Sequence, residues 1–216
     1  MDFENVYRSR FIIYKLLKLR GYDTSKYDNQ SKEELNILFQ HHSKKINTEL
    51  DSLDMFIEGK NNNILVKYLL SEKIRSKLIE KQIENQYSNL LTDEDTCILI
   101  TKENLKESDK LKFKGGLDEF LNRNFMTKGR FIQIFWLNTL LFDPTTHILN
   151  PKYKILNDEE KKGILHKYNI EENLLPSILI NDPLGMFYGV KLNEVIEIIK
   201  PSETNGFTKS YRLCIN

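Results

Sequence analysis

The sequence predicts an α+β protein in which a helix-and-sheet domain over residues 1–143 is followed by a small mixed α/β domain over residues 144–216. The first observation behind this prediction is that all five prolines occur from Pro144 onward, which indicates a change of architecture there. The second is that helix-capping motifs and short apolar runs of strand character occur in both parts. The third is the stretch 201–216, whose turn residues and alternating apolar residues predict a terminal hairpin.

The composition is that of a globular protein. Hydrophobic residues make up 40% and charged residues 29% of the 216 residues, and no apolar run is long enough for a membrane span. The chain begins with the acidic stretch Met1–Glu4 and has no signal-peptide pattern, so we expect an intracellular protein. Because 32 basic residues nearly balance 31 acidic ones, any contact with DNA requires a local basic patch.

The first predicted element is an amphipathic helix from Val6 to Leu19 that stops at Gly21. Four basic side chains lie between its apolar residues, and they fit either a solvated face or an edge that faces a polyanion. They are Arg8, Arg10, Lys15 and Lys18. The capping box Ser31–Glu34 predicts the start of a second helix.

Strands and one long helix are predicted to follow. The segment Gly59–Asn63 has the composition of a hairpin loop between two strands. The elements predicted around and after this loop are strands at 54–58 and 64–70, a charged helix at Ser71–Asn89, and buried strands at Thr96–Thr101 and Arg130–Leu137.

Between the last two strands the sequence predicts a lysine-rich loop beside the sheet. Such a loop can contact phosphates, but its interleaved acidic residues fit ordinary solubility equally well. The basic residues of this stretch are Lys102, Lys106, Lys110, Lys112, Lys114, Arg123, Lys128 and Arg130.

The C-terminal part contains two further cap signals. The capping box Asn157–Glu160 predicts a helix that runs through Tyr168. Downstream, Asp182 is the predicted cap of a short helix with Pro183 in its first turn, which ends at Gly189.

The terminal hairpin follows these helices. Its first strand is predicted at Val195–Ile199 and its second includes the alternating residues of Tyr211–Ile215. Pro201, Asn205 and Gly206 form the turn between them, so the chain ends inside its own sheet.

Cysteine and histidine do not indicate a metal site. Cys97 and Cys214 lie in apolar, strand-like contexts and are predicted to be core residues. The four histidines and two cysteines lack the spacing of a zinc site, so we expect no metal. The neighbours His41 and His42 are predicted to lie on a solvated helix face.

One arrangement suggests an enzyme. Asp54 followed by Glu58-Gly-Lys60 resembles the acid and acid-x-lysine pattern with which some nucleases hold a divalent ion. The glycine and asparagines that follow favour a hairpin loop instead, and no nucleophile elbow or phosphate-binding loop occurs in the sequence.

Several motifs of the last third together resemble one family. The sequence from His147 to Ile215 resembles the shared fifth subunit of eukaryotic nuclear RNA polymerases and its archaeal counterpart. Arg20-Gly21-Tyr22 after the first helix is similar to the additional jaw domain that only the eukaryotic version carries. The motifs are Asn150-Pro151-Lys152, Asp158–Lys161, Leu165–Tyr168, Leu175-Pro176, Asp182-Pro183, Tyr188-Gly189, Glu194–Ile196, Ser202–Gly206 and Tyr211-Arg212.

The resemblance implies a polymerase subunit without catalytic activity. Its C-terminal domain would be an assembly module that docks on the largest subunit beside neighbouring small subunits, and its N-terminal domain would form part of the jaw near downstream DNA. No cofactor is expected in this chain, because magnesium and zinc would reside in other subunits. The expected location is the nucleus, or the viral factory and virion if a large DNA virus encodes the chain.

The resemblance also implies two sets of site residues. The candidate assembly interface comprises His147, Pro151, Pro176, Asp182, Pro183, Gly189, Ser202, Glu203, Thr204, Gly206, Tyr211 and Arg212. The candidate DNA-facing residues are Arg8, Lys15, Arg20, Lys112 and Lys114.

Four residues depart from the family pattern. Ser177 and Phe207 stand where basic residues are usual, Asn193 where a turn glycine is common, and Gly163 where a glutamate is common. The departures and the isoleucine, asparagine and lysine bias fit an AT-rich genome, and we hypothesise a divergent protist or a large DNA virus. The alternatives to a polymerase subunit are a free-standing nucleic-acid-binding or adaptor protein with the same module, and the metal-dependent nuclease.

Overall fold

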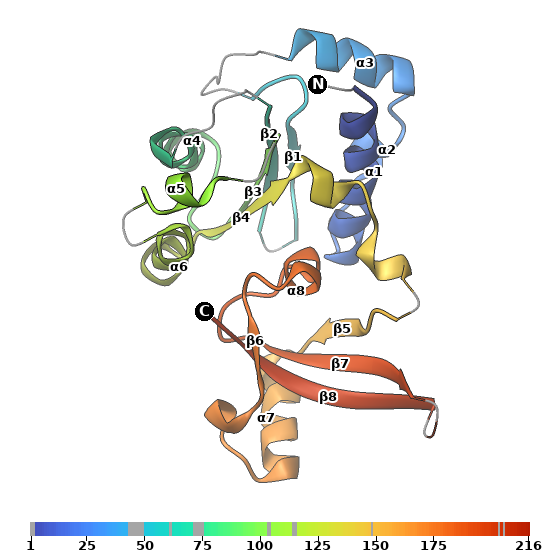
Figure 1. The fold of residues 1–216 in the computed structure, drawn as a ribbon, viewed down its shortest axis with the longest axis vertical. Coiled ribbons are helices and arrows are strands. Elements are labelled where there is room, and N and C mark those ends of the chain that lie inside the picture. Colours follow the sequence, from blue (N-terminus) through green and yellow to red (C-terminus); the bar gives the residue numbers. More distant parts are fainter. Residues whose placement is uncertain are drawn as a thin grey trace. The chain divides into compact units, whose positions relative to one another are not determined.

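The fold is described from a computed structural model (Figure 1). It describes residues 3–42, 50–60, 62–70, 76–102, 105–113, 116–147, 149–202, 204 and 206–216. The chain divides into two compact units, Met1–Phe142 and Asp143–Asn216, and each contains a four-stranded sheet with helices. The predicted α+β class is confirmed. None of the helices in the described ranges is long and apolar enough to span a membrane.

The N-terminal unit is built on a mixed sheet with the strand order β1-β2-β3-β4. β1 pairs with β2 in antiparallel fashion, whereas β2, β3 and β4 are parallel. Every residue of β2 and β3 is buried, as expected of parallel strands covered on both faces. The strands are β1 (Met55–Ile57), β2 (Ile64–Leu69), β3 (Thr96–Thr101) and β4 (Phe131–Trp136).

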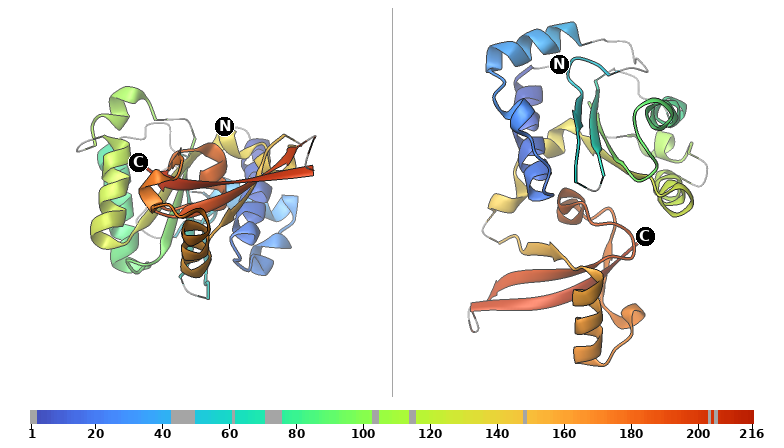
Figure 2. Two further views of the ribbon diagram at one scale, coloured as in Figure 1. Left: turned by 90° about the horizontal axis from the view of Figure 1, so that it is seen from below. Right: turned by 180° about the vertical axis from the view of Figure 1, so that it is seen from behind.

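Helices cover both faces of this sheet. Figures 1 and 2 show α1, α2 and α3 on one side of the strands and α4, α5 and α6 on the other. On the second side, Ile79 and Ile83 of α4 pack with Leu65, Cys97 and Leu99 in one buried cluster. The helices are α1 (Phe3–Leu19), α2 (Ser25–Asp28), α3 (Lys32–His41), α4 (Ser76–Asn89), α5 (Glu107–Lys110) and α6 (Leu117–Lys128), and the 3-10 turn η1 (Leu137–Leu140) follows β4.

Most of the helix and strand predictions for the N-terminal unit are confirmed. Gly21 has φ +84° just after α1, and the Ser31–Glu34 capping box is formed at the start of α3. The hairpin of β1 and β2 and the two parallel strands are confirmed. The first residues of the predicted charged helix Ser71–Asn89, 71–75, lie outside the described residues.

The predicted lysine-rich loop is wrong, because most of it is helical. α6 begins after Gly116 and ends at Gly129, which has φ +74° and caps the last turn. The apolar residues Leu117, Phe120 and Leu121 pack against the buried cluster under α4. The helical spacing of its apolar residues was not recognised in the sequence because many charged residues lie between them.

The hairpin loop before β2 depends on glycine at position 59. A Cβ at Gly59 would lie 2.1 Å from the carbonyl oxygen of Asn62 and 2.8 Å from Tyr22 Cε1. We expect Gly59→Ala to lower the free energy of unfolding by about 1–3 kcal/mol because the backbone has to shift. The control is Gly163→Ala on the exposed face of a helix, where nothing lies within 4 Å and Ala should stabilise by about 0.5–1 kcal/mol. Urea denaturation of both variants checks the opposite signs.

The C-terminal unit contains the second sheet, with the strand order β5-β7-β8-β6. The terminal hairpin is confirmed, but its strands are longer than predicted, with unbroken pairing from Val195↔Leu213 to Ser202↔Gly206. Pro201 and Gly206, predicted in the turn, therefore lie in the paired strands, and Asn205 lies outside the described residues. The sequence predicted neither of the other two strands: β6 joins β8 in parallel fashion, and β5 joins β7 in antiparallel fashion. The strands are β5 (Lys152–Ile155), β6 (Ser177–Leu179), β7 (Val195–Ser202) and β8 (Gly206–Ile215).

Two helices of this unit begin at the predicted caps. Asn157 and Glu160 form the capping box of α7 (Asp158–Tyr168). The carboxylate of Asp182 caps α8 (Pro183–Tyr188), and Gly189 ends that helix with φ +77°. The remaining helical turns are η2 (Pro144–Thr146) and η3 (Glu172–Leu174).

Both cysteines are buried core residues, as predicted. Burial raises the pKa of the Cys97 thiol to about 12 and that of the Cys214 thiol to about 11. We therefore expect neither thiol to react with a disulfide reagent at pH 8 in the folded chain, and both to react once denaturant unfolds it. Rapid labelling of either thiol without denaturant contradicts this placement.

Candidate assembly and DNA-facing surfaces

Three of the candidate assembly residues shape the short helix α8. Asp182 Oδ1 accepts a hydrogen bond from the backbone N–H of Gly185 at 2.8 Å. Pro183 occupies the first turn, where its missing N–H costs nothing, and Gly189 adopts the left-handed conformation that ends the helix. Local folding of α8 explains why aspartate, proline and glycine stand at these three positions.

Three further candidates surround the junction of β6 and β8. The carbonyl of Pro176 accepts a hydrogen bond from the backbone N–H of Leu213 at 2.9 Å, and Arg212 Nη1 donates to the carbonyl of Ser177 at 3.0 Å. Tyr211 donates its hydroxyl to Glu197 Oε1 at 3.1 Å, and the same carboxylate oxygen lies 2.9 Å from Lys209 Nζ. These contacts hold the base of the hairpin in register.

The other candidate assembly residues lie at turns. Ser202 pairs with Gly206 at the hairpin end, where Gly206 has φ +71° and the hydroxyls of Ser202 and Thr204 are 3.3 Å apart. Pro151 directly precedes β5, and the exposed His147 accepts a hydrogen bond at Nδ1 from the N–H of Leu149. Glu203 lies outside the described residues.

A different set of residues has the chemistry of a docking surface, and the sequence did not reveal it. Leu179 and Ile215 are neighbours in the β6–β8 pairing, and both are exposed. They extend the row of Leu213, which is buried with Leu175 and Val195. The large apolar side chains exposed in this unit include Leu149, Tyr168, Leu174, Leu179, Phe207 and Ile215.

The structure shows the surroundings of three residues that depart from the family pattern. Asn193 has φ +66°, a conformation that glycine adopts without strain and asparagine tolerates better than most residues. The side chain of Phe207 is 70% exposed near the hairpin end. The carbonyl of Ser177 is the acceptor for Arg212, so a backbone contact is made at this position.

The candidate DNA-facing residues do not form one uniform group. Arg8 and Lys15 are exposed on α1, although Arg8 Nε lies 3.3 Å from Glu4 Oε1. Arg20 is half-buried and donates from Nη2 to Gln133 Oε1 of β4 at 2.6 Å, so its guanidinium is directed to the sheet. Lys112 is exposed just after α5, and Lys114 lies outside the described residues.

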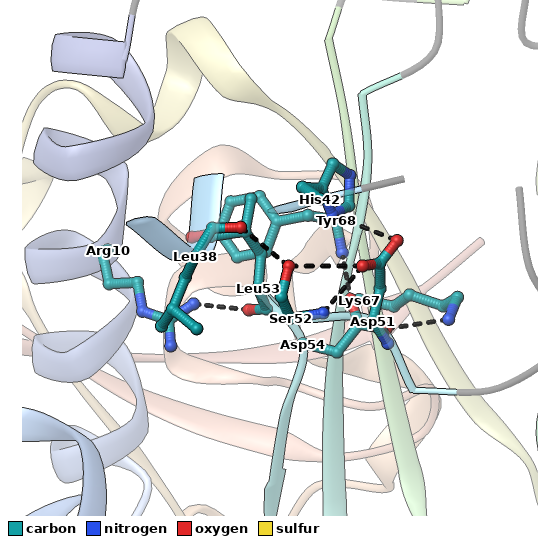
Figure 3. A network of polar contacts seen from close by, with 9 residues as sticks. All are labelled: Arg10, Leu38, His42, Asp51, Ser52, Leu53, Asp54, Lys67 and Tyr68. Atoms are coloured by element: carbon teal, nitrogen blue, oxygen red, sulfur yellow. Dashed lines mark hydrogen bonds and ion pairs between the residues drawn. The ribbon is translucent and has the colours of Figure 1, made fainter. Parts of the chain in front are cut away.

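One basic residue of α1 is buried rather than solvated. The side chain of Arg10 is 1% exposed and donates to Tyr14 Oη at 2.9 Å and to Gln30 Oε1 at 3.1 Å. It also donates to the carbonyl of Leu53, as Figure 3 shows. Tyr68 lies on its other side, with the ring centroid 6.0 Å from the guanidinium carbon. The prediction of a solvated or polyanion-facing edge is therefore wrong for Arg10.

Asp54 belongs to the same buried network, shown in Figure 3. Its Oδ2 accepts from Lys67 Nζ at 2.8 Å and from the N–H of Asp51 at 2.9 Å, while Oδ1 accepts from the N–H of Tyr68 at 3.0 Å. The exposed fraction of the two side chains is 3% for Lys67 and 0% for Asp54. Both oxygens of the Asp54 carboxylate therefore accept hydrogen bonds, and these bonds join β2 to the segment before β1.

The geometry does not assemble the nuclease pattern. Asp54 is engaged by Lys67 and two backbone N–H groups, whereas Glu58 and Lys60 are exposed beyond the end of β1. Within the described part of the chain, no three Asp, Glu, His or Cys side chains gather as a metal site would require. The hairpin interpretation of this segment is the one that holds.

The histidine prediction needs a correction. His42 is not on a solvated face, because its side chain is 8% exposed and its Nδ1 lies 3.2 Å from Asp51 Oδ2. Asp51 also accepts from the N–H of Ser52 at 2.7 Å, and Ser52 donates its hydroxyl to the carbonyl of Leu38. The end of α3 is thereby tied to the segment before β1 (Figure 3).

The C-terminal unit is similar to a known protein family. A family model described as RNA polymerase Rpb5, C-terminal domain, matches residues 142–214. The chain is also similar to a Dictyostelium discoideum protein named DNA-directed RNA polymerases I, II, and III subunit rpabc1. The two are 33% identical over 132 residues, which cover 60% of this chain and 63% of that protein, slightly less than two thirds.

A second relative is aligned over nearly the whole chain. It is an Arabidopsis thaliana protein named DNA-directed RNA polymerases IV and V subunit 5B, and it is 25% identical over 217 residues. This alignment covers 97% of the chain and 89% of the relative. Similarity to a polymerase subunit therefore extends into the N-terminal unit.

Proposed function

We propose that the chain is a non-catalytic subunit of a multisubunit DNA-directed RNA polymerase, because residues 142–214 match the family model of the RNA polymerase Rpb5 C-terminal domain. The observation that carries this proposal is that the family match spans almost the whole compact unit Asp143–Asn216. Both relatives described above are named as subunits of DNA-directed RNA polymerases. The chain contributes architecture to the enzyme, and other subunits carry out the chemistry.

In this proposal the C-terminal unit is the assembly domain and docks on the largest subunit, beside neighbouring small subunits. Its support is the exposed apolar row of Leu179 and Ile215, which extends a buried cluster of the unit. Apolar residues that continue a core onto the surface are typical of a protein interface. In this proposal the predicted turn residues contribute indirectly, because they shape the fold that exposes Leu179 and Ile215.

The N-terminal unit is proposed to be the jaw near downstream DNA. The nearly full-length similarity to the Arabidopsis polymerase subunit supports its inclusion in the same assembly. Of the candidate DNA-facing residues, the exposed Arg8, Lys15 and Lys112 are retained in this role. Arg20 is left out of the proposed set, because its guanidinium is hydrogen-bonded to Gln133 in the sheet.

The proposal includes no cofactor in this chain. Magnesium and zinc would belong to other subunits of the polymerase, and no step of catalysis is attributed to residues described above. The site of action would be the nucleus, as for a nuclear polymerase. An origin in a large DNA virus, with a viral factory and virion as the location, stays a hypothesis.

The proposal is tested by purifying the full chain through an affinity tag from the cells in which it is naturally made. We expect the catalytic subunits of one polymerase to be recovered with it in fixed proportion, and the eluate to transcribe DNA. Recovery of the tagged chain only as a free monomer would refute the proposal and favour the free-standing adaptor. Magnesium-dependent DNA cleavage by that monomer, lost in Glu58→Ala, would favour the nuclease.

A further inference from the structure

One edge of β8 is uncovered along most of the strand. On one side of β8, the whole of β7 pairs with residues Gly206 to Leu213. On the other side, β6 pairs only with residues 213–215. Among the residues that the structure describes, no strand is paired to this outer edge between Gly206 and Arg212.

The hydrogen bonds at the base of the hairpin show which backbone groups face this edge. The N–H of Leu213 donates to Pro176 and the carbonyl of Ile215 accepts from Ile180, so these odd-numbered residues face β6. The N–H of Cys214 donates in the opposite direction, to Glu194. Backbone groups alternate along a strand, and the β7–β8 register has no bulge. The N–H and C=O groups of residues 207, 209 and 211 therefore point to the open edge.

The outer half of the hairpin is also uncovered on its two faces. All residues from Gly206 to Ser210 are exposed, as are Lys200 and Pro201 on the facing strand. Figures 1 and 2 show β7 and β8 running on together beyond the short strand β5. A two-stranded ribbon of this kind is marginally stable alone, and an open edge is a template for another strand.

The side chains beside the open edge define the chemistry of the strand that fits it. Phe207, Lys209 and Tyr211 alternate with the exposed polar residues of β8 and lie on one face. On this face Lys209 Nζ lies 2.9 Å from Glu197 Oε1, so the charge of Lys209 is already paired, whereas Lys200, opposite Thr208, and Arg212 lie on the other face. A segment with an uncharged side chain between two apolar ones matches this row.

We infer that the 207–211 edge of β8 binds an extended segment of another polymerase subunit by β-strand addition. The segment supplies backbone N–H and C=O groups to residues 207, 209 and 211, with apolar side chains beside Phe207 and Tyr211 and an uncharged one beside the Lys209–Glu197 pair. This inference rests on the proposed function and names the way in which the assembly domain is bound. It gives the exposed Phe207, which departs from the basic family pattern, a place at an apolar contact.

The backbone character of this interaction allows a sharp test. Lys209→Pro removes one outward N–H and leaves the pairing with β7 intact, because proline is tolerated where the N–H points away from the ladder. Lys209→Ala is the matched control, since it removes the side chain and keeps the N–H. We expect about tenfold or greater loss of recovery with the polymerase for Lys209→Pro, and less than about threefold for Lys209→Ala. Both free variants should melt within a few degrees of the unmodified chain.

Amide hydrogen exchange tests the same contact without a substitution. The N–H groups of residues 207, 209 and 211 should exchange rapidly in the free chain and be protected in the purified polymerase. Equal recovery of the proline and alanine variants, or rapid exchange of these three groups in the polymerase, would overturn the inference while the proposed function stands. Protection that rises with the concentration of the free chain would assign the edge to a second copy of this chain and overturn the inference too.

Failure of the proposed function has a different signature. In that case the unmodified chain itself is not recovered with the polymerase, so no comparison of position 209 variants is involved. The two proposals therefore fail in distinguishable experiments.

Discussion

A chain truncated after Thr208 is expected to be absent from the polymerase. The deletion removes residues 209–216, which are most of β8, and β8 is an inner strand that pairs with both β7 and β6. It also removes Leu213 and Cys214, which belong to the two buried clusters of the C-terminal unit. Without them neither face of the sheet retains its core, so the assembly domain should not fold.

The N-terminal unit should survive this truncation. Its sheet β1–β4 and its buried cluster contain no residue beyond Phe142. Circular dichroism of the purified truncated chain should therefore show a cooperative melting transition, while co-purification with the polymerase is abolished. The matched control is deletion of Asn216 alone, an exposed residue after β8 that should change neither property. Normal incorporation of the chain that ends at Thr208 contradicts this account of the assembly domain.

The second large effect is expected in the N-terminal unit, for Asp54→Ala. This substitution removes the carboxylate that lies 2.8 Å from the buried Lys67 ammonium, and with it the acceptor for the N–H groups of Asp51 and Tyr68. Breaking one side of a buried ion pair typically costs about 3–5 kcal/mol of the free energy of unfolding. We expect a loss of this size in urea denaturation.

A double substitution separates the ion pair from simple packing. Asp54→Leu combined with Lys67→Met removes both charges, and we expect it to recover part of the loss because neither charge of the pair then stays buried. A control at the surface is Glu107→Ala, whose pair with Lys110 is exposed and contributes about 0–1 kcal/mol. A loss below about 1 kcal/mol for Asp54→Ala would contradict the assigned role of the pair.

Local signals in the sequence were sufficient to predict the caps and the hairpin. Asn157 with Glu160, Asp182 with Pro183, and Gly189 act within one or two turns of chain, and each performs its predicted role. The terminal hairpin was predictable because its apolar alternation and turn residues are also local. These signals did not predict β5 and β6, two short strands that are defined by their pairing with β7 and β8.

Burial of charge was not predictable in the same way. Arg10 and Lys67 look like ordinary solvated cations in the sequence, and both are buried because partners distant in the sequence surround them. The partners of Arg10 include Leu53 and Tyr68, which periodicity within α1 cannot reveal. His42 was misassigned for the same reason, since Asp51 lies beyond a stretch of intervening chain.

The candidate site shows a related limit. Residues such as Asp182 and Gly189 stand out in the sequence because their local chemistry is distinctive, and the structure explains them by helix α8. The exposed apolar pair Leu179 and Ile215 does not stand out, because leucine and isoleucine in a strand read as core. Only the pairing of β6 with β8 reveals that this row continues beyond the buried cluster.

The central claim, that this chain is a structural subunit of an RNA polymerase, is tested most directly from the side of the enzyme. The polymerase is purified through a tag on its largest subunit, and the amount of this chain in the transcriptionally active fraction is measured by quantitative mass spectrometry. We predict one copy of the chain per largest subunit, maintained through a salt wash and gel filtration. An active polymerase that contains all its other subunits and lacks this chain would contradict the account.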